Sequence, residues 1–385
     1  MASRPRVVVL RGHQANPWDL RPWELLADRY DVAYLRSRSN WFATDGIGLA
    51  ATEGRTLRDL LPPGRLGDFA VRLPGDRYLG LAEQLAGADI VHAQELGYWY
   101  AMQAARLKRR LGFRLVLTVW ETLPFLGAYR NVRTRAYRRE TLAETDLFLA
   151  ATQRAADCLL LEGVDAGRVR VCAPGIDLER FAPSGRTPGG PPIVLSPGRL
   201  VWEKGHQDVL RSLALLRRRG APGADGRIRI VGAGSEGGRL RRYAKELGID
   251  DAVELHEFVP YERMPNLYAE AACIVLGSLA TWAWEEQFGM VLIEAMASGV
   301  PIVASSSGAI PEVAGPEATY FAPGDWQGLA TALSEGPLAW PQPHVVADPA
   351  RVRHFSAAAA AERLAAAYDQ LYEAARPRQG RGMAV

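Results

Sequence analysis

Short apolar runs alternate with longer amphipathic segments along almost the whole chain. Most of these runs are apolar at nearly every position, which is typical of parallel strands that helices cover on both faces. The intervening segments, such as 81–87 and 100–112, have helical character. In the first half the predicted strands are 6–10, 31–35, 89–93, 114–120, 147–151 and 168–173. This alternation predicts a doubly wound α/β domain.

The pattern breaks at 182–192, where Pro, Gly and Ser dominate and the apolar period is lost. Such a composition is typical of an interdomain linker. A second series of predicted strands follows, at 192–198, 227–234, 252–260, 273–278 and 301–308. We therefore expect an α/β protein with two Rossmann-like doubly wound domains, at residues 1–183 and 184–355. An alanine-rich segment predicts a last helix at 356–376, and residues 377–385 are expected to form a flexible tail.

The composition is that of a folded globular protein, with 48% hydrophobic and 23% charged residues among 385. The apolar run near the N-terminus is only four residues long before Arg11, which predicts a strand and not a signal peptide. No apolar stretch is long enough to cross a bilayer. Cys158, Cys172 and Cys273 show no CxxC spacing, so we expect reduced, buried thiols in a cytoplasmic protein.

The net charge of +3 is unevenly distributed along the chain. Up to Ser184 there are 26 Arg and Lys against 21 Asp and Glu, and the remainder has 20 against 22. Much of the excess lies in two Arg-rich helical segments, 105–114 and 129–140. They are either solvated helix faces or a surface for peripheral contact with a membrane leaflet or for an anionic acceptor. Nucleic-acid binding is not expected, because the charge is modest and no recognition motif accompanies it.

Two glutamates, Glu286 and Glu294, stand eight positions apart around a predicted helix at 290–297. The helix stops at Ser298-Gly299. Both carboxylates can face its N-terminal end, where free N–H groups and the helix dipole attract phosphate. Carboxylates beside a phosphate make sense if they accept hydrogen bonds from sugar hydroxyls attached to it. A structural interpretation also stands, in which Glu294 tunes the helix dipole and Glu286 is a loop charge.

Two cations follow the first predicted strand of the second half. Arg199 and Lys204 lie just after this strand, in the stretch SPGRLVWEKGHQDVL. Ligands of open α/β sheets bind at this edge, and a guanidinium fork with an ammonium group suits a diphosphate.

Several motifs in register now resemble the retaining glycosyltransferases of family 4, which have the GT-B fold. They are PGIDLERFAP, GRLVWEKGH, RIRIVGAGSEGGRL, LHEFVP, EEQFGMVLIEAMASGVPIVAS and GAIPEVAG, and the similarity is strong over 171–314. Glu286 and Glu294 match the family's pair of glutamates separated by seven residues. The resemblance implies two domains facing a central cleft, with the C-terminal helix crossing back to the N-terminal domain.

The resemblance also implies a reaction and the residues that perform it. A hexosyl group would pass with retention from a nucleoside-diphosphate sugar to a hydroxyl-bearing acceptor, without a cofactor. Arg199 and Lys204 would hold the diphosphate and replace a metal ion, Glu286 would contact the transferred sugar, and Glu294 the ribose. The other implied donor-binding positions are Gly12, His13, Gly198, Gly232, Phe258, Val259, Phe288, Gly289 and Met290.

The chain departs from the family pattern on the acceptor side. Gly12 stands alone where relatives have a glycine pair, and His13 or Asn16 could substitute by approaching the donor. Trp120, followed by Glu121, occupies the place of a family histidine, as core filler or as a wall for a sugar acceptor. His92 is either a family-type strand-end histidine or a buried core residue. Trp282 and Trp284, before the first glutamate, either contact the acceptor or pack under their loop.

Three alternative functions stay open on the sequence. Gly232, Gly234 and Gly237 form a GxGxxG after a strand, with Glu254 downstream, which resembles a dinucleotide fingerprint of an NAD-dependent oxidoreductase. Against it, the motif follows the second strand of its domain and leaves Arg199 and Lys204 unexplained. A nucleotide-sugar epimerase on the same fold and a non-catalytic nucleotide-sugar sensor are the other two alternatives.

Overall fold

The computed structural model describes residues 4–62, 64–71, 75–126, 132–183, 190–257, 259–340 and 347–375. The chain divides into two compact units, the first formed by Met1–Ile176 with Ser356–Val385 and the second by Asp177–Phe355. Residues 184–189 of the expected linker and the expected tail 377–385 lie outside the described residues.

The division comes earlier than the predicted domain boundary after Pro183. The chain leaves the first unit at Ile176 and returns beside it, because the Ala357 N–H donates to the Ile176 carbonyl at 2.8 Å. Phe181 already packs edge-on against Tyr261 and Tyr268 of the second unit, with ring centroids 5.6 and 5.9 Å apart. This aromatic packing explains why residues 177–183 belong to the second compact unit.

The first unit contains a sheet of seven strands in the order β3-β2-β1-β4-β5-β6-β7, all paired in parallel. All six strands predicted for the first half are confirmed. The strand β3 was missed, because its residues AATEG are mostly exposed and carry no apolar run. The bounds are β1 Arg6–Gly12, β2 Asp31–Ser37, β3 Ala50–Gly54, β4 Ile90–Gln94, β5 Arg114–Val119, β6 Leu147–Ala150 and β7 Val169–Val171.

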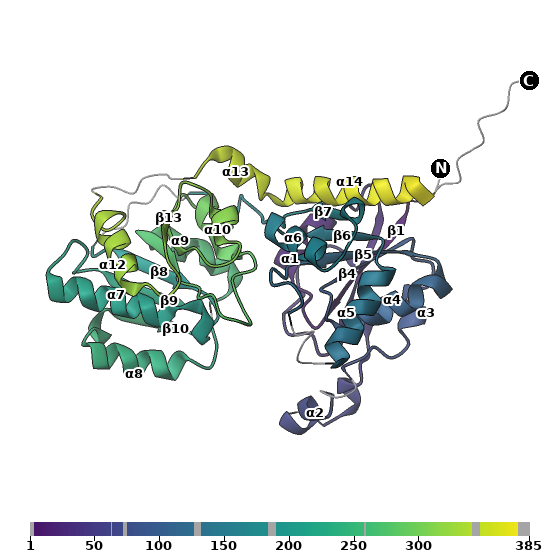
Figure 1. Ribbon diagram of the computed structural model, residues 1–385, viewed down its shortest axis with the longest axis horizontal. Coiled ribbons are helices and arrows are strands. Elements are labelled where there is room, and N and C mark those ends of the chain that lie inside the picture. The colour runs from purple at the N-terminus through teal and green to yellow at the C-terminus, as the bar shows by residue number, and fades with distance from the viewer. Residues whose placement is uncertain are drawn as a thin grey trace, which may run out of the picture. The chain divides into compact units, whose positions relative to one another are not determined.

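Helices cover both faces of this sheet, as uniformly apolar strands require. One buried cluster joins the strands to α3, α4 and α6, and another joins them to α1 and α14. Figure 1 shows α14 crossing the first unit, and the Trp23 indole of α1 donates to the Tyr368 hydroxyl of α14 at 2.8 Å. The bounds are α1 Pro17–Glu24, α2 Arg65–Ala70, α3 Leu81–Leu85, α4 Trp99–Leu111, α5 Val132–Glu144, α6 Gln153–Leu161 and α14 Ala357–Ala375.

The second unit contains six parallel strands in the order β10-β9-β8-β11-β12-β13. All five predicted strands are confirmed, and the short β13 was missed. The strand bounds are β8 Ile193–Pro197, β9 Arg227–Val231, β10 Val253–His256, β11 Cys273–Leu276, β12 Ile302–Ser305 and β13 Thr319–Phe321. The helix bounds are α7 His206–Arg219, α8 Gly237–Leu247, α9 Met264–Glu270, α10 Met290–Ala297, α11 Ile310–Ala314, α12 Trp326–Glu335 and α13 Pro349–His354.

Each sheet has one point at which the chain order reverses. In the first unit this switch point lies between β1 and β4, and in the second between β8 and β11. Loops that leave neighbouring strands in opposite directions open a crevice there, and open α/β sheets bind their ligands in it. The fold therefore marks one candidate binding edge in each unit.

The three cysteines are buried and free, as predicted. Burial raises the pKa of all three thiols, so they stay protonated and unreactive. Among the helices that the structure describes, none is long and apolar enough to cross a membrane.

The two loops at the β8/β11 switch point touch through glycine backbones. Gly205 has φ +71°, and a Cβ atom there would lie 1.9 Å from the Gly277 carbonyl oxygen. Gly248 has the same φ, but nothing lies within 4 Å of its Cβ position. Alanine at Gly248 would meet only the cost of a left-handed backbone, whereas alanine at Gly205 would also meet a steric clash. Comparing the two substitutions therefore separates these two costs.

We expect Gly248→Ala to destabilise the protein by about 1 kcal/mol, the usual cost of a left-handed alanine. Gly205→Ala should cost at least about 2 kcal/mol more, because two backbone segments must also separate. Urea unfolding of both variants measures the difference. Equal losses would show that the loops at 205 and 277 are not held in contact.

Candidate functional site

The β8/β11 switch point of the second unit positions a lysine against a glutamate. Lys204 ends a short 3-10 helix after β8, and Glu286 lies in the loop after β11. The Lys204 Nζ is 2.6 Å from the Glu286 Oε2, and both side chains are largely buried. The Ser278 hydroxyl donates to the same carboxylate oxygen at 2.5 Å. Two residues predicted from distant motifs are thus brought into direct contact.

The backbone of Glu286 is held by the loop that follows β12. Its N–H donates to the Ser307 hydroxyl at 3.3 Å, and its carbonyl accepts from the Ala309 N–H at 2.8 Å. Gly308 has φ +55°, and a Cβ there would lie 2.1 Å from the Glu286 carbonyl oxygen. Ser278 and Ser307 were not singled out by the sequence, because isolated serines carry no signal until the fold brings three loops together.

Arg199 occupies the loop after β8 with an exposed side chain. Within the described part of the chain its guanidinium group makes no hydrogen bond or ion pair, whereas its carbonyl lies 3.1 Å from the Nε2 of buried His206. Burial lowers the pKa of His206 to about 4, so this imidazole is neutral and its second nitrogen binds the Ser196 hydroxyl at 2.8 Å. The loop is fixed while the arginine tip is free to meet an anion.

The GxGxxG motif has a packing role in this structure. A Cβ at Gly232 would lie 1.9 Å from the Gly198 carbonyl oxygen, and one at Gly234 would lie 2.3 Å from that of Leu200. These glycines let the loop after β9 approach the loop that carries Arg199. Glu254, the candidate ribose partner of a dinucleotide, instead lies 2.7 Å from the Arg229 guanidinium. The acid that a dinucleotide fingerprint would use for the ribose is therefore paired with an arginine in this structure.

The N-terminus of α10 lies on the same loop as Glu286. Gly289 precedes the helix with φ +85°, and Met290 is its first residue, so the first N–H groups lack helical partners. Phe288 is buried and packs edge-on against Phe355 at 5.7 Å, which leaves its backbone as the part that could meet a ligand. Val259 lies in the loop after β10, and Phe258 lies outside the described residues.

Glu294 is a buried carboxyl group inside α10. The Tyr268 hydroxyl donates to its Oε2 at 2.7 Å. Burial raises the pKa of Glu294 to about 7, while hydrogen bonds from Tyr268 and Tyr261 act in the opposite direction. The sequence identified the glutamate but not the two tyrosines, which reach it from the segment before β11.

The two tryptophans before Glu286 differ in their surroundings. The Lys204 Nζ lies 5.0 Å from the centroid of the Trp284 ring, a cation–π contact. Trp282 has an exposed side chain. Trp284 therefore belongs to the same cluster as Lys204 and Glu286, and Trp282 lies two positions before it in the same loop.

In the first unit, Gly12 ends β1 at the switch point and His13 follows it. Gly12 has φ +58°, and the Tyr100 ring occupies the space of its missing side chain. The His13 Nε2 lies 2.5 Å from the Asp76 Oδ2, and its Nδ1 lies 2.5 Å from the Ser37 hydroxyl. His13 lines a cavity of about 840 Å³ in this unit.

His92 is a core residue and not an acceptor contact. It is fully buried, with its ring nitrogens 2.6 Å from the Tyr368 hydroxyl and 2.7 Å from the Thr118 hydroxyl. Burial lowers the pKa of His92 well below its ordinary value, so it stays neutral. Of the two interpretations open on the sequence, the structure supports the buried one.

Trp120 and Glu121 follow β5 beside a second buried acid. The Trp120 N–H donates to the Glu95 carboxylate at 2.7 Å, and Glu95 has a left-handed backbone with φ +61°. Burial raises the pKa of Glu95 to about 7. The Glu121 carboxylate accepts from the N–H groups of Thr122 and Leu123, both at 2.9 Å. These bonds fix the segment, and no sequence motif pointed to Glu95.

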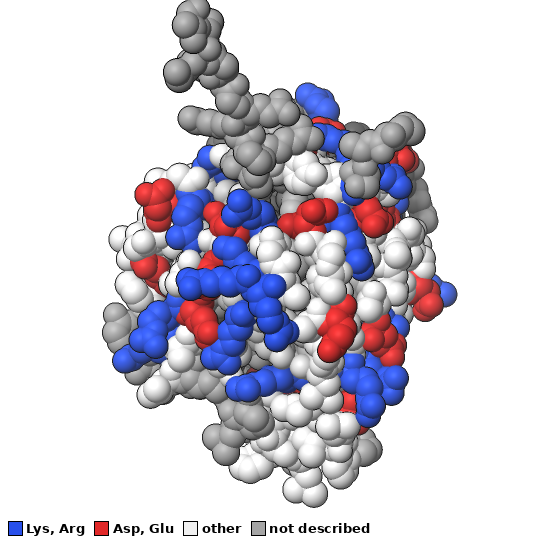
Figure 2. Space-filling model, turned by 90° about the vertical axis from the view of Figure 1, so that its right-hand side faces the viewer, with Lys and Arg blue, Asp and Glu red and all other residues white. Residues whose placement is uncertain are grey.

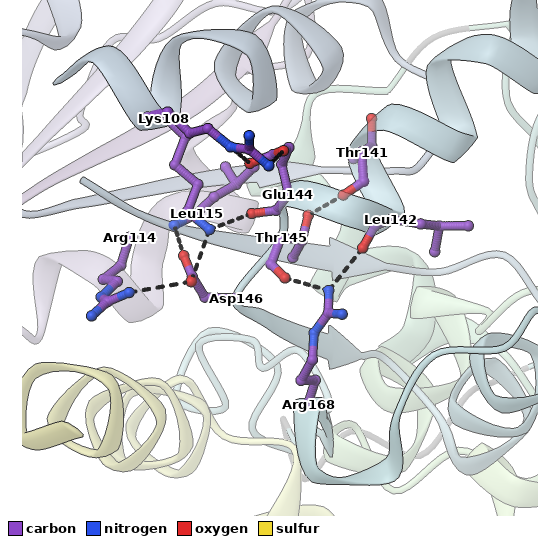
Figure 3. Close-up of polar contacts among 10 residues, drawn as sticks. Lys108, Arg114, Leu115, Thr141, Leu142, Glu144, Thr145, Asp146 and Arg168 are labelled. Atoms are coloured by element: carbon purple, nitrogen blue, oxygen red, sulfur yellow. Dashed lines mark hydrogen bonds and ion pairs between the residues drawn. The ribbon is translucent and has the colours of Figure 1, made fainter. Parts of the chain in front are cut away.

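The Arg-rich helices carry acidic partners. Arg106 pairs with Glu140 at 2.7 Å, and Lys108 pairs with Asp146 at 2.8 Å. Figure 3 shows Lys108 and Arg114 converging on Asp146, and Figure 2 shows acidic side chains among the basic ones on the face that it draws. Paired charges of this kind favour the solvated-face interpretation over a uniformly basic docking surface.

Two family models match consecutive parts of the chain. The one described as Glycosyltransferase Family 4 matches residues 12–180, and the one described as Glycosyl transferases group 1 matches residues 178–336. Together they extend over residues 12–336, which include parts of both units and every residue of the β8/β11 site. The chain belongs to glycosyltransferase family 4.

Curated members of the family resemble this chain over part of their length. A D-inositol 3-phosphate glycosyltransferase of Nocardia farcinica is 32% identical over 255 residues, which are 60% of this chain and 54% of the relative. A GDP-mannose-dependent alpha-(1-6)-phosphatidylinositol monomannoside mannosyltransferase of Mycolicibacterium smegmatis is 33% identical over 191 residues, 46% of this chain and 47% of the relative. The chain thus spans about half the length of these two relatives.

Solved structures share the fold over nearly the whole chain. Sucrose-phosphate synthase from Thermosynechococcus elongatus has a TM-score of 0.75 at 22% identity, covering 97% of this chain and 100% of that one. HepE from Anabaena in complex with UDP and glucose has a TM-score of 0.72 at 18% identity, covering 94% and 99%. The expected GT-B fold of family 4 is confirmed.

The sequence predicts a reaction without a metal ion, with Arg199 and Lys204 in its place. Among the residues that the structure describes, no group of three or more His, Cys, Asp or Glu side chains is arranged to hold a metal ion. Independence from metal stays a prediction about the reaction.

The titration of Glu294 should make stability depend on pH. The folded protein keeps this proton up to about pH 7, whereas the unfolded chain releases it near pH 4.5, so stability falls as pH rises through this window. The loss is on the order of 3 kcal/mol. Glu294→Gln should flatten the fall, as measured by hydrogen exchange in peptides of β8 and β11. Glu335→Gln, at the exposed end of α12, controls for the removal of a carboxylate. If the unmodified protein and both variants lost stability equally as pH rises, Glu294 would not be the group that titrates.

Proposed function

We propose that this protein transfers a hexosyl group from a nucleoside-diphosphate sugar to an acceptor hydroxyl, with retention of configuration and without a metal ion. The observation that carries the proposal is the Lys204–Glu286 pair at the β8/β11 switch point, 2.6 Å apart and beside the N-terminus of α10. A cation, a carboxylate and free N–H groups at one sheet edge suit a ligand that combines phosphate with sugar hydroxyls.

In the proposed step the acceptor oxygen bonds to the anomeric carbon as the bond from that carbon to the diphosphate oxygen breaks. The acceptor attacks on the face from which the diphosphate leaves, and the departing phosphate oxygen takes the acceptor proton. Negative charge accumulates on the diphosphate. Lys204, Arg199 and the N–H groups of α10 stabilise that charge, and they do so as preorganised groups because their loops are fixed before the donor arrives.

Glu286 has two roles in this scheme. Without a ligand it neutralises Lys204, which would otherwise be a buried, unpaired ammonium group. With the donor bound, the diphosphate replaces it as the partner of Lys204, and the carboxylate accepts hydrogen bonds from sugar hydroxyls. Ser278 keeps one carboxylate oxygen in place in both states.

Glu294 serves the nucleoside end of the donor. Its carboxyl group accepts hydrogen bonds from ribose hydroxyls, and the Tyr268 hydroxyl holds it in position. Hydroxyl donors favour the ionised form, so donor binding lowers the pKa of Glu294 from about 7. Two similar proteins support this class of donor. HepE from Anabaena was solved in complex with UDP and glucose, and the mannosyltransferase of Mycolicibacterium smegmatis is named for its dependence on GDP-mannose.

Lys204→Ala should reduce the turnover number at least about 100-fold, the usual cost of one preorganised charge in a transition state. Lys245→Ala, an exposed lysine on α8, should leave turnover unchanged. Coupled detection of the released nucleoside diphosphate measures both. A Lys204→Ala protein that turns over normally would remove the central element of the proposal.

Treatment with EDTA should leave transfer intact, because protein cations stabilise the leaving group. The assay is product formation before and after chelation and gel filtration. Complete loss that Mg²⁺ restores would contradict the metal-free scheme. Consumption of donor without any acceptor, with release of a stereoisomeric sugar, would indicate the alternative epimerase.

A further inference from the structure

The first unit contains a large cavity at the edge where β1, β2 and β4 end. Its volume is about 840 Å³, enough for a sugar or cyclitol ring. His13 and Gln14 reach it from the loop after β1, Trp41 from the loop after β2, and Trp99 from the start of α4. This is the switch point of the first sheet, the place where an α/β unit binds its ligand.

Aromatic side chains form much of the wall. Trp41 is 69% exposed and stacks on the His13 ring, with centroids 5.7 Å apart and planes at 13°. Trp99 lies 5.7 Å from the same imidazole at 58°, so the two indoles flank His13. The exposed Trp41 indole offers apolar surface to a ligand. Such faces pack well against the C–H faces of sugar and cyclitol rings.

His13 serves as a fixed part of this wall. Both of its ring nitrogens are engaged, one by Asp76 and the other by Ser37, each at 2.5 Å. Asp76 also accepts from the Arg58 backbone N–H at 2.8 Å. The imidazole therefore has no free nitrogen with which to take a proton from a ligand.

The charges around the cavity are unfavourable for an anion. Of the described wall residues, Arg58 is the arginine, and its guanidinium donates to the carbonyls of Pro62 at 3.0 Å and Gly64 at 3.4 Å. Asp59 and Asp76 line the same wall. A phosphate group in the cavity would meet two carboxylates. The Arg58 guanidinium group, which could offset them, already donates to backbone carbonyls.

Two further acidic residues, Glu95 and Glu121, lie near Tyr98, which is part of the cavity wall. Burial raises the pKa of the Tyr98 hydroxyl, and the charges of Glu95 and Glu121 raise it further. The Gln14 amide donates to this hydroxyl at 3.2 Å, and the Gln94 amide donates to Gln14 at 2.7 Å. The polar groups at this end of the cavity are neutral donors and acceptors.

We propose that this cavity binds the acceptor of the transfer, and that the acceptor is an uncharged polyhydroxylated ring and not a phosphate ester. The inference rests on the proposed function, which requires an acceptor hydroxyl. It separates this protein from the curated relatives named for D-inositol 3-phosphate, although the chain resembles them in sequence. Aromatic faces hold the ring, and the carboxylates accept hydrogen bonds from its hydroxyls. The Gln14 amide donates to these hydroxyls or accepts from them, and the negative carboxylates in the wall exclude phosphate.

The test compares matched pairs of rings on the full chain saturated with UDP. The probes are myo-inositol with inositol 3-phosphate, and methyl glucoside with glucose 6-phosphate, and saturation-transfer NMR measures their affinities. At least one uncharged ring should bind about tenfold or more tightly than its phosphate ester. Trp41→Ala should weaken that binding about fivefold to tenfold, since one stacking face is lost. Phe69→Ala removes an aromatic of equal exposure, 68%, that does not line the cavity, and it should change nothing.

A charge variant tests the reason for the selectivity. Asp59→Asn should improve binding of the phosphate esters several-fold relative to the uncharged rings, because it removes a negative charge from the cavity wall. Equal or tighter binding of the phosphate esters by the unmodified protein would overturn the inference, as would failure of every uncharged ring to bind. An effect of Phe69→Ala equal to that of Trp41→Ala would overturn it as well.

Binding and transfer are measured separately so that the two proposals can fail independently. UDP binding and transfer to a phosphorylated acceptor, unaffected by Trp41→Ala, would preserve the proposed function and refute the cavity assignment. Ring binding with the expected selectivity, but without transfer from any nucleotide sugar, would refute the proposed function and support the cavity as a site for uncharged rings.

Discussion

The close approach of two backbone segments at Gly205 and Gly277 determines the rest of the candidate donor site. One loop leaves β8 and carries Lys204, and the other leaves β11 and carries Glu286. Because neither glycine has a side chain, the loops pass within van der Waals contact, and the Leu279 N–H donates to the Glu203 carbonyl at 2.8 Å. A lysine and a glutamate 82 positions apart in the chain are thereby held 2.6 Å apart.

The polar groups of this site are satisfied before any ligand arrives. Lys204 is paired with Glu286, and the Glu294 carboxyl group is bound by Tyr268. Leaving such groups buried and unpaired would cost several kcal/mol. The same contacts place each group where an incoming diphosphate or hydroxyl can exchange with its partner. Arg199 is the exception, since its loop is fixed and its side chain is exposed.

The two units share one topology but differ in the chemistry of their switch points. Both sheets reverse order after their first strand in sequence, at β1/β4 and at β8/β11. The second unit places a cation, a carboxylate and a helix N-terminus there. The first unit places tryptophans, a fixed histidine and carboxylates around a cavity of about 840 Å³. The common fold supplies a binding edge, and the loops decide what binds.

The sequence by itself determined the fold class and eleven of the thirteen strands found among the described residues, and it singled out Lys204 and Glu286, which the structure brings into contact. These features are local: an apolar run predicts a strand wherever it packs, and motifs in register carry their chemistry with them. The strands β3 and β13 escaped because they are short and carry no long apolar run.

Tertiary structure alone decided which groups meet. Tyr268 reaches Glu294, Ser278 reaches Glu286, Asp76 reaches His13, and Phe181 joins the second unit, each through contacts between segments distant in the chain. Single serines, tyrosines and aspartates have no pattern of their own in sequence. Their roles arise from burial and from the distance to one partner, and packing fixes both only when the sheets have formed.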